Sequence, residues 1–399
     1  MIFTSRKEQR MLGTFKRGAV ALLLGIAMVG CSQQPIEEKP IEKKPIKPPV
    51  KVEKPQKPPV VAKPKPKPQP RAQRAYRQPR PQVIGQPKGG RSFAGDPRLT
   101  SFINKMVRKH GFNRNYLTGV FAKVRHRSWI DRYMNRPRVK GKRSKTGGWS
   151  RYRAKFLKES KYRKGMTFWR QNRAALLRAQ AQYKVPAEYI MSIIGVETHF
   201  GGNFGKYRVI DALTTIALTN KRRSKYFFSE LENFLLMTRS ERMNPLHPVG
   251  SHAGAMGFGQ FMPSSFRSYA VDFDRNGVKD LWNATDAIGS VANYFKRHGW
   301  RYGETVTQRA RVVGKGYKSL KSGFKTKYSL AKLAKHGVYP PGRARNSGRT
   351  SLLTLSTYSG DEVWLGYGNF YAITRYNHST YYAMAIHQLA QQMKRRMGR

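Results

Sequence analysis

The residues Ala187–Gly202, AEYIMSIIGVETHFGG, decide how the rest of the chain is interpreted. Pro186 before them suits the first turn of a helix, where its missing N–H costs nothing. Three isoleucines and then Glu197 follow at i, i+3, i+4 and i+7, which is the spacing of one helix face. Gly201 and Gly202 supply the expected stop. The stretch therefore predicts a helix that carries a carboxyl group on its apolar face.

A carboxyl group at such a position has two interpretations. Burial disfavours the charged form, so Glu197 would stay protonated near neutral pH, as a general acid must be. The same pattern fits a structural Glu197 that is paired with a buried cation. The sequence around the helix has to decide between them.

The charge balance is extreme. The chain of 399 residues has 78 Lys and Arg against 21 Asp and Glu, for a formal net charge of +57. The length allows two or three domains. A surface this basic indicates a polyanionic neighbour, which is a nucleic acid, an anionic membrane or an anionic cell wall.

The N-terminus narrows that choice, because it resembles an export signal. A basic segment precedes the apolar run Ala19–Val29, which is too short to span a bilayer and leads to Cys31, the only cysteine. The stretch resembles a bacterial lipobox, with a signal peptide at 1–30 and lipidation of Cys31, although Met28 replaces the usual Leu. Ser32 after the cysteine indicates the outer membrane. A soluble periplasmic protein with a free Cys31 is the alternative, and export in either form argues against a nucleic-acid partner.

The composition divides the rest of the chain. More than half of the 23 prolines lie between Pro35 and Pro81 among lysines, so residues 31–95 read as an extended tether. Apolar periodicity predicts helices around 99–106, 116–124, 168–183 and 381–397. Short β-branched and aromatic runs predict strands at Val306-Thr307, Ala310–Val313, Tyr328-Ser329 and Ser351–Leu355.

Three further motifs follow the helix. The first is the glycine-rich stretch Gly254–Ser265, GAMGFGQFMPSS, whose glycines allow a ligand to come close to the backbone. It also has an amide at Gln260 and aromatic faces at Phe258 and Phe261. Asn369–Tyr382 is rich in aromatic and amide side chains. Both compositions suit a carbohydrate cleft, and both also suit tight packing.

The third motif, Asp272–Val278, has oxygen side chains at positions 1, 3 and 5 and a glycine at 6, as in the first half of an EF-hand Ca²⁺ loop. Position 12 is Asn283 where a glutamate is expected, and the next carboxylate is Asp286. The second half is thus broken or lengthened, and a metal-free turn is the alternative.

Taken together in this order, the motifs resemble the membrane-bound lytic murein transglycosylase B family of peptidoglycan-cleaving lipoproteins, from about Phe168 to the C-terminus. The resemblance implies a mainly α (α+β) fold, in which a lysozyme-like helical core carries a flanking helical domain and a small β-rich domain. It implies a helical domain at 96–172, a catalytic core at 173–301 with the EF-hand-like loop, a β-rich domain at 302–365, and a return to the core at 366–399.

The resemblance also implies the roles of residues. Glu197 is the implied catalytic acid and base. The implied glycan and peptide contacts are Ser251, Gln260, Phe261, Tyr226, Arg222, Arg223, Tyr294, Tyr376, Asn377, Tyr382 and Tyr152. The implied ligands of a structural Ca²⁺ are Asp272, Asp274, Asn276, the Val278 carbonyl and Asp286, and no cofactor is implied for catalysis.

The activity implied is that of a carbon–oxygen lyase, which cleaves the β-1,4 bond between N-acetylmuramic acid and N-acetylglucosamine and leaves 1,6-anhydromuramoyl ends without consuming water. The alternatives are a lysozyme-type muramidase and a non-catalytic, basic wall-binding lipoprotein. We expect a monomeric outer-membrane lipoprotein of a Gram-negative bacterium that faces the periplasm, with peptidoglycan strands and outer-membrane lipid at Cys31 as its partners.

Overall fold

The computed structural model describes residues 89–137, 146–346, 348 and 350–398, all of which belong to one compact unit of the chain. The predicted signal peptide, Cys31 and nearly all of the predicted tether lie outside the described residues. None of the helices described is both long enough and apolar enough to cross a membrane.

Helices dominate the described residues, as the sequence predicted. In chain order they are α1 Pro97–His110, α2 Arg114–Ala122, α3 Ser128–Asn135, α4 Gly148–Arg153, α5 Glu159–Tyr183, α6 Ala187–Thr198, α7 Val209–Thr219, α8 Ser224–Ser240, α9 Pro263–Tyr269, α10 Ala284–Arg297, the 3₁₀ turn η2 Gly316–Ser319, α11 Leu330–Ala334, α12 Gly368–Tyr376 and α13 Thr380–Met397.

The strands are short and form three separate antiparallel sheets. They are β1 Tyr207–Arg208, β2 Val249–Gly250, β3 Thr307–Arg309, β4 Arg311–Val312, β5 Val338–Tyr339, β6 Ser351–Thr357 and β7 Gly360–Gly366. β1 pairs with β2, β4 pairs with β5, and the third sheet has the order β3-β7-β6. A second, smaller apolar core lies in this β-rich part of the chain, around Leu333, Val338, Leu352 and Leu365.

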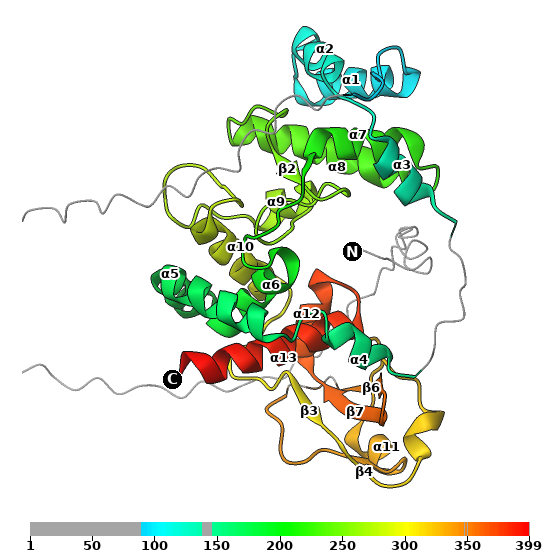
Figure 1. Cartoon of the computed structure of the whole chain (residues 1–399), viewed down its shortest axis with the longest axis vertical. Helices are drawn as coiled ribbons and strands as arrows, with labels where there is room; N and C mark the ends of the chain where they lie inside the picture. The colour runs from blue at the N-terminus through cyan, green and yellow to red at the C-terminus, as the bar shows by residue number, and fades with distance from the viewer. Residues whose placement is uncertain (1–88, 138–145, 347, 349, 399) are drawn as a thin grey trace, which may run out of the picture. The chain divides into compact units, whose positions relative to one another are not determined.

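Helix α6 lies in the main core, in contact with α5, α10 and α13 (Figure 1). Every residue from Ala187 to Val196 is buried, so its whole circumference, and not one stripe, faces protein. The helix starts after Pro186, which is the N-cap and not a residue of the first turn. Such an element is held in one position by packing on all sides.

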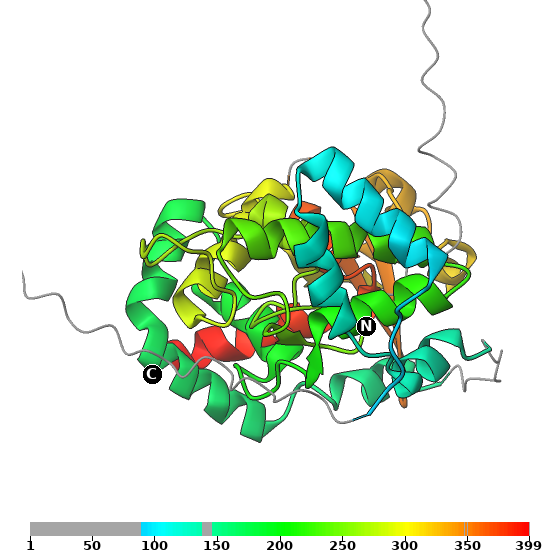
Figure 2. The ribbon, with the colours of Figure 1, turned by 90° about the horizontal axis from the view of Figure 1, so that it is seen from above.

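The N-terminal helices α1 and α2 lie over α7 and α8, as the view from above shows (Figure 2). Phe102 of α1 packs on Phe228 of α8, with ring centroids 5.5 Å apart. Glu232 of α8 accepts hydrogen bonds from Lys105, Lys109 and His110, so polar contacts reinforce the apolar ones.

Several predicted element boundaries are wrong. α6 ends at Thr198, before the two glycines, because His199 and Phe200 themselves adopt left-handed backbone conformations. The helix predicted around 116–124 is α2, which begins at Arg114 and ends at Ala122, and its Tyr116 is 49% exposed. Tyr328-Ser329 is not a strand, since the Ser329 side chain caps α11 by accepting the Lys332 N–H.

Candidate active site

Glu197 stands at the last turn of α6, where the buried helix reaches an open cleft. The cleft has a volume of about 460 Å³ and is lined by Glu197, Asn203, Gly205, Lys206, Tyr207, Ser251, His252 and Gln260. Glu197 is partly exposed there, while its helical neighbours Val196 and Thr198 are buried. Among these described lining residues, Glu197 is the only carboxyl group.

The chain after α6 turns back sharply to make one wall of the cleft. His199, Phe200 and Gly201 take φ values of 56°, 61° and 87°. Gly205 has a φ of 93°, and a Cβ atom there would lie 2.0 Å from the Gly250 carbonyl oxygen, so only glycine fits. This turn brings residues 203–207 back over the end of their own helix.

The opposite wall comes from a segment more than forty residues further along the chain. Tyr207 in β1 pairs with Gly250 in β2, which places Ser251 and His252 beside the turn. The Ser251 hydroxyl accepts the backbone N–H groups of Ala253 and Ala255. Two strands of two residues each thus bring the walls together.

The carboxyl group of Glu197 has one direct hydrogen bond from a side chain. The Tyr382 hydroxyl on α13 donates to Glu197 Oε1 at 2.6 Å. Burial raises the pKa of Glu197 above its usual value, while the Tyr382 hydrogen bond and the Lys161 ammonium act in the opposite direction. The environment therefore favours a protonated acid without making its ionised form inaccessible.

Lys161 on α5 is a buried cation whose charge lowers the pKa of Glu197. Its Nζ donates to the Gly195 carbonyl at 2.7 Å and to His199 Nδ1 at 3.2 Å. Burial lowers the pKa of Lys161 to about 8, with repulsion from Lys164 adding to the effect and the Glu197 charge opposing it. Lys161 thus binds the end of α6 through the Gly195 carbonyl and His199. Its charge interacts with that of Glu197, but the described residues include no hydrogen bond between the two side chains.

The glycine-rich loop meets the cleft through Gln260. This residue has a φ of 51°, and its amide nitrogen donates to the carbonyls of Gly257 and Phe204. Phe258 and Phe261, which the sequence offered as stacking faces, are buried at 3% and 2% exposure. Both rings pack into the core that supports the loop, so for these two residues the structure fits the tight-packing alternative and not a free stacking face.

The aromatic segment at the C-terminus lies behind that loop. The Tyr376 hydroxyl donates to the Gly259 carbonyl at 2.6 Å, and its ring packs against Phe261 and Tyr294. Tyr294 donates in turn to the Arg375 carbonyl at 2.7 Å. Asn377 caps the end of α12 and is partly buried.

Tyr152 on α4 also lies near Glu197. Burial raises the pKa of Tyr152 to about 12, and the charge of Glu197 contributes to that rise. Its ring packs against Trp149, Phe156 and Tyr381.

The three residues predicted around α8 are not among those that line this cleft. Arg222 is exposed, and the Arg223 guanidinium lies 4.6 Å from the ring centroid of Tyr226. Burial raises the pKa of Tyr226, as does its proximity to Glu230.

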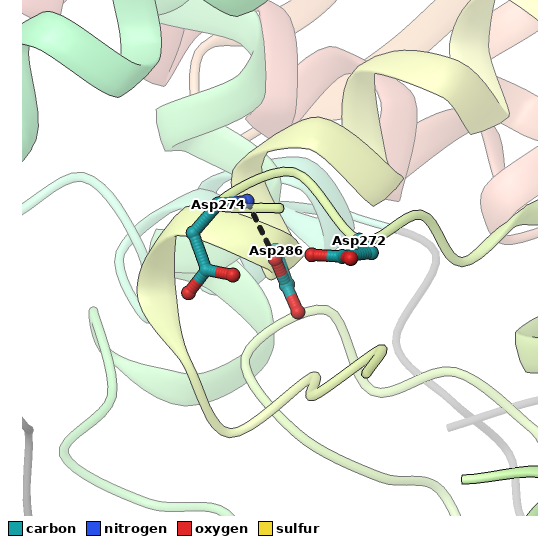
Figure 3. Close-up of side chains that lie close together, drawn as sticks. All are labelled: Asp272, Asp274 and Asp286. Atoms are coloured by element: carbon teal, nitrogen blue, oxygen red, sulfur yellow. Dashed lines mark hydrogen bonds between the residues drawn. The ribbon is translucent and has the colours of Figure 1, made fainter. Parts of the chain in front are cut away.

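The EF-hand-like loop brings its three carboxylates together. Ligand atoms of Asp272, Asp274 and Asp286 all lie within 4.8 Å of one another (Figure 3). Asp286, in the first turn of α10, accepts the N–H groups of Phe273, Asp274 and Asp280. Burial raises the pKa of Asp286 to about 6, and repulsion from Asp274 adds to the rise, so a bound cation would stabilise the ionised form of this group. An oxygen-only donor set of this kind fits Ca²⁺.

A second cavity, of about 560 Å³, lies in the β-rich part against β3, β4 and η2. It contains none of the predicted site residues among the described residues that line it. Because Glu197 lines the smaller cleft and accepts a hydrogen bond from the buried Tyr382 behind it, we take that cleft as the candidate active site.

Sequence reasoning missed several residues of this cleft. Asn203, Lys206 and Tyr207 follow α6 directly, and the glycine-rich exit of that helix is the signal that could have indicated them. Lys161 had no such signal, because it lies in a long basic segment where any lysine would be expected to be solvated.

Comparison with known proteins agrees with this geometry. Residues 94–391 match the family model described as the transglycosylase SLT domain. The membrane-bound lytic murein transglycosylase B of Escherichia coli (strain K12) is 48% identical over 306 residues, which are 76% of this chain and 84% of that protein.

Solved structures are similar over most of the chain as well. Those of the Escherichia coli lytic transglycosylase Slt35, one with bulgecin A and one with calcium, are 46% identical with a TM-score of 0.73, covering 78% of this chain and 96% of theirs. SltB3 from Pseudomonas aeruginosa, solved with NAG-NAM-pentapeptide, is 28% identical with a TM-score of 0.64, covering 76% of this chain and 80% of its own.

Proposed function

The chain belongs to the transglycosylase SLT domain family and is a lytic murein transglycosylase, and from this premise we propose that Glu197 is its single catalytic carboxyl group. The observation that carries the proposal is the position of Glu197: it is the one carboxyl among the described cleft residues, with a raised pKa and a hydrogen bond from Tyr382. Ordinary glycosidases use two carboxyl groups that flank the scissile bond. A cleft with one such group fits a reaction in which the substrate supplies its own nucleophile.

The mechanism follows from that arrangement. Glu197 donates its proton to the oxygen that links N-acetylmuramic acid to N-acetylglucosamine, and the bond from that oxygen to the muramoyl C1 breaks. The muramoyl C6 hydroxyl attacks C1, and its proton passes to the Glu197 carboxylate. The acid is thereby regenerated, no water is consumed, and a 1,6-anhydromuramoyl end forms. The tethered nucleophile gains the entropic advantage of an intramolecular reaction.

The remaining site residues have proposed roles in holding the glycan. Ser251 and Gln260 present a hydroxyl and an amide to the cleft, where sugar hydroxyls and acetamides need such partners. The residues that we propose to shape and support the cleft are Tyr152, Phe261, Tyr294, Tyr376, Asn377 and Tyr382. We further propose that Arg222 and Arg223 contact the anionic stem peptide, because both are cations, and that Tyr226, which lies beside Arg223, contacts the glycan.

Calcium is proposed as a structural ion. Asp272, Asp274 and Asp286 would supply carboxylate ligands, with the Asn276 side chain and the Val278 carbonyl completing the set. When bound, the ion would neutralise the carboxylates and fix the start of α10, a helix that packs against α6. No catalytic step requires it.

The chain is similar to a membrane-bound lytic murein transglycosylase of Escherichia coli. This similarity supports a location in the Gram-negative cell envelope. We propose that Cys31 is lipidated, that residues 31–95 tether a monomeric enzyme to the outer membrane on its periplasmic side, and that the folded part divides at 172, 301 and 365.

The test is an analysis of products by mass spectrometry after digestion of purified sacculi. We expect muropeptides with 1,6-anhydro ends from the wild-type chain and none from Glu197→Gln, which should still bind sacculi. Reducing ends in place of anhydro ends would instead establish a lysozyme-type hydrolase. Sacculus cleavage that survives Glu197→Gln would exclude Glu197 as the acid.

A further inference from the structure

Four aromatic side chains lie together at the cleft, and none of them belongs to the predicted binding residues. Trp129 and Tyr133 stand four residues apart on α3, so they share one helix face. Tyr207 and His252 come from the two walls of the cleft itself. We call these four residues the aromatic shelf.

The planes of the three larger rings are nearly parallel. The centroids of Trp129 and Tyr133 are 5.0 Å apart with an interplanar angle of 13°, and those of Trp129 and Tyr207 are 5.9 Å apart at 9°. His252 stands edge-on to the group, 4.8 Å from Tyr133 at 79°. Because Tyr207 and His252 belong to both, the shelf continues directly from the cleft that holds Glu197.

Trp129 carries the exposed surface of the shelf, while the other three rings are partly buried. Trp129 is 43% exposed, whereas Ile130 beside it is fully buried. Arg127 at the start of α3 binds the buried carboxylate of Asp211 on α7, with Nε to Oδ2 at 3.0 Å. A helix anchored at its start thus presents the exposed ring of Trp129 to solvent, beside partly buried aromatic neighbours.

Two cations lie close to residues of the shelf. The Arg136 guanidinium lies 5.0 Å from the ring centroid of Tyr133, and the exposed Lys206 lines the cleft next to Tyr207. A glycan strand of peptidoglycan carries stem peptides with carboxylates, so this charge complements the same ligand that the rings would bind.

We propose that the aromatic shelf is a further glycan subsite, on which one additional sugar ring of the strand held at Glu197 stacks by its C–H face. A pyranose ring offers a flat apolar face with hydroxyls around its rim, so the face covers the exposed aromatic surface while the rim stays in water. This inference rests on the proposed function, because the strand must run through the cleft to reach the shelf.

The test measures binding as a function of ligand length, in the full chain carrying Glu197→Gln so that no ligand is cleaved. The probes are β-1,4-linked N-acetylglucosamine oligomers of two to six sugars, titrated by calorimetry. We expect affinity to rise with length, and we expect Trp129→Ala to lower it about tenfold for the longest oligomers and not for the disaccharide. Trp129→Phe, which keeps a ring, should recover part of the loss.

Tyr116→Ala is the matched control, because Tyr116 on α2 is similarly exposed at 49% but lies outside both the shelf and the lining of the cleft. It should leave every affinity unchanged. An equal loss for short and long oligomers in Trp129→Ala, or no loss for either, would overturn the shelf as a subsite. The product analysis of the wild-type chain is a separate result, so a failure of the proposed activity would not be mistaken for a failure of the shelf.

Discussion

Replacing Tyr382 by phenylalanine should change the pH dependence of catalysis in a direction that the structure fixes. The substitution removes the hydroxyl that donates to Glu197 Oε1 at 2.6 Å and keeps the buried ring. That hydrogen bond favours the ionised carboxyl and lowers the pKa of Glu197 against the effect of burial. Without it the pKa of Glu197 rises, so the general acid stays protonated to higher pH.

The rate should fall at the same time. Hydrogen bonds to charged groups contribute about 1.5–3 kcal/mol. Glu197 gains carboxylate character as it gives up its proton, so part of that energy is available only in the transition state. With about 1.4 kcal/mol for each factor of ten, we expect kcat to fall about tenfold or somewhat more.

The assay is the release of anhydro products from soluble, uncrosslinked glycan strands, measured from acid to alkaline pH. The alkaline limb of kcat/KM reports the free enzyme's acid. Tyr376→Phe is the control, since the Tyr376 hydroxyl donates to the Gly259 carbonyl and not to Glu197. An alkaline limb that stays in place or moves to lower pH in Tyr382→Phe, or that moves equally in the control, would refute the reasoning.

Three other predictions concern stability. The folded state binds the Glu197 proton more tightly than the unfolded chain does, so the contribution of Glu197 to stability falls as pH rises above about 4.5. Glu197→Gln lacks this titration, so its Tm relative to that of the wild type should increase over the same range, by about 2 °C for each kcal/mol. Calcium at about 100 times its dissociation constant should stabilise the fold by about 2.7 kcal/mol in thermal denaturation, EDTA should reverse this, and Asp286→Asn should abolish the response; an unchanged Tm would leave the loop as a metal-free turn. Gly205→Ala should lower the free energy of unfolding by about 2 kcal/mol or more, since its Cβ atom would lie 2.0 Å from the Gly250 carbonyl oxygen. The control is Gly299→Ala, which has a similar φ of 87° and open space around it, and it should cost only about 1 kcal/mol in the same denaturant titrations.

The sequence predicted the parts of the site that depend on local spacing. The helix carrying Glu197 was evident because its apolar residues repeat at helical spacing within a few turns, and Glu197 takes one of the positions in that repeat. Burial of the whole helix was not evident, since it depends on α5, α10 and α13, which come from both sides of α6 in the chain. Tyr382 was named by the family resemblance, but its hydrogen bond to Glu197 was not evident, because it joins residues 185 positions apart.

The parts that were missed depend on tertiary pairing. Tyr207 and His252 meet only because β1 and β2 pair, and strands of two residues leave no periodic signal. The strand β7 was missed because GDEVWLG opens with two acids, although it is the centre of its sheet. Trp129 in a short helix next to a basic segment gave no reason to expect a surface site.

A single carboxyl group that serves as both acid and base must be accessible in its protonated and its ionised form. The surroundings of Glu197 provide this, because some of them raise its pKa and others lower it. Burial in the core favours the protonated form, which starts the reaction. Tyr382 from α13 and Lys161 from α5 favour the ionised form, which must exist until the C6 hydroxyl gives up its proton. Lys161 also binds the Gly195 carbonyl, so it fixes the position of the carboxyl as well as its charge balance. Lys161→Met should therefore move the alkaline limb to higher pH, as Tyr382→Phe does, while lowering kcat. A limb that stays in place would show that Lys161 acts on the position of α6 alone, and a limb that moves to lower pH would contradict the electrostatic role.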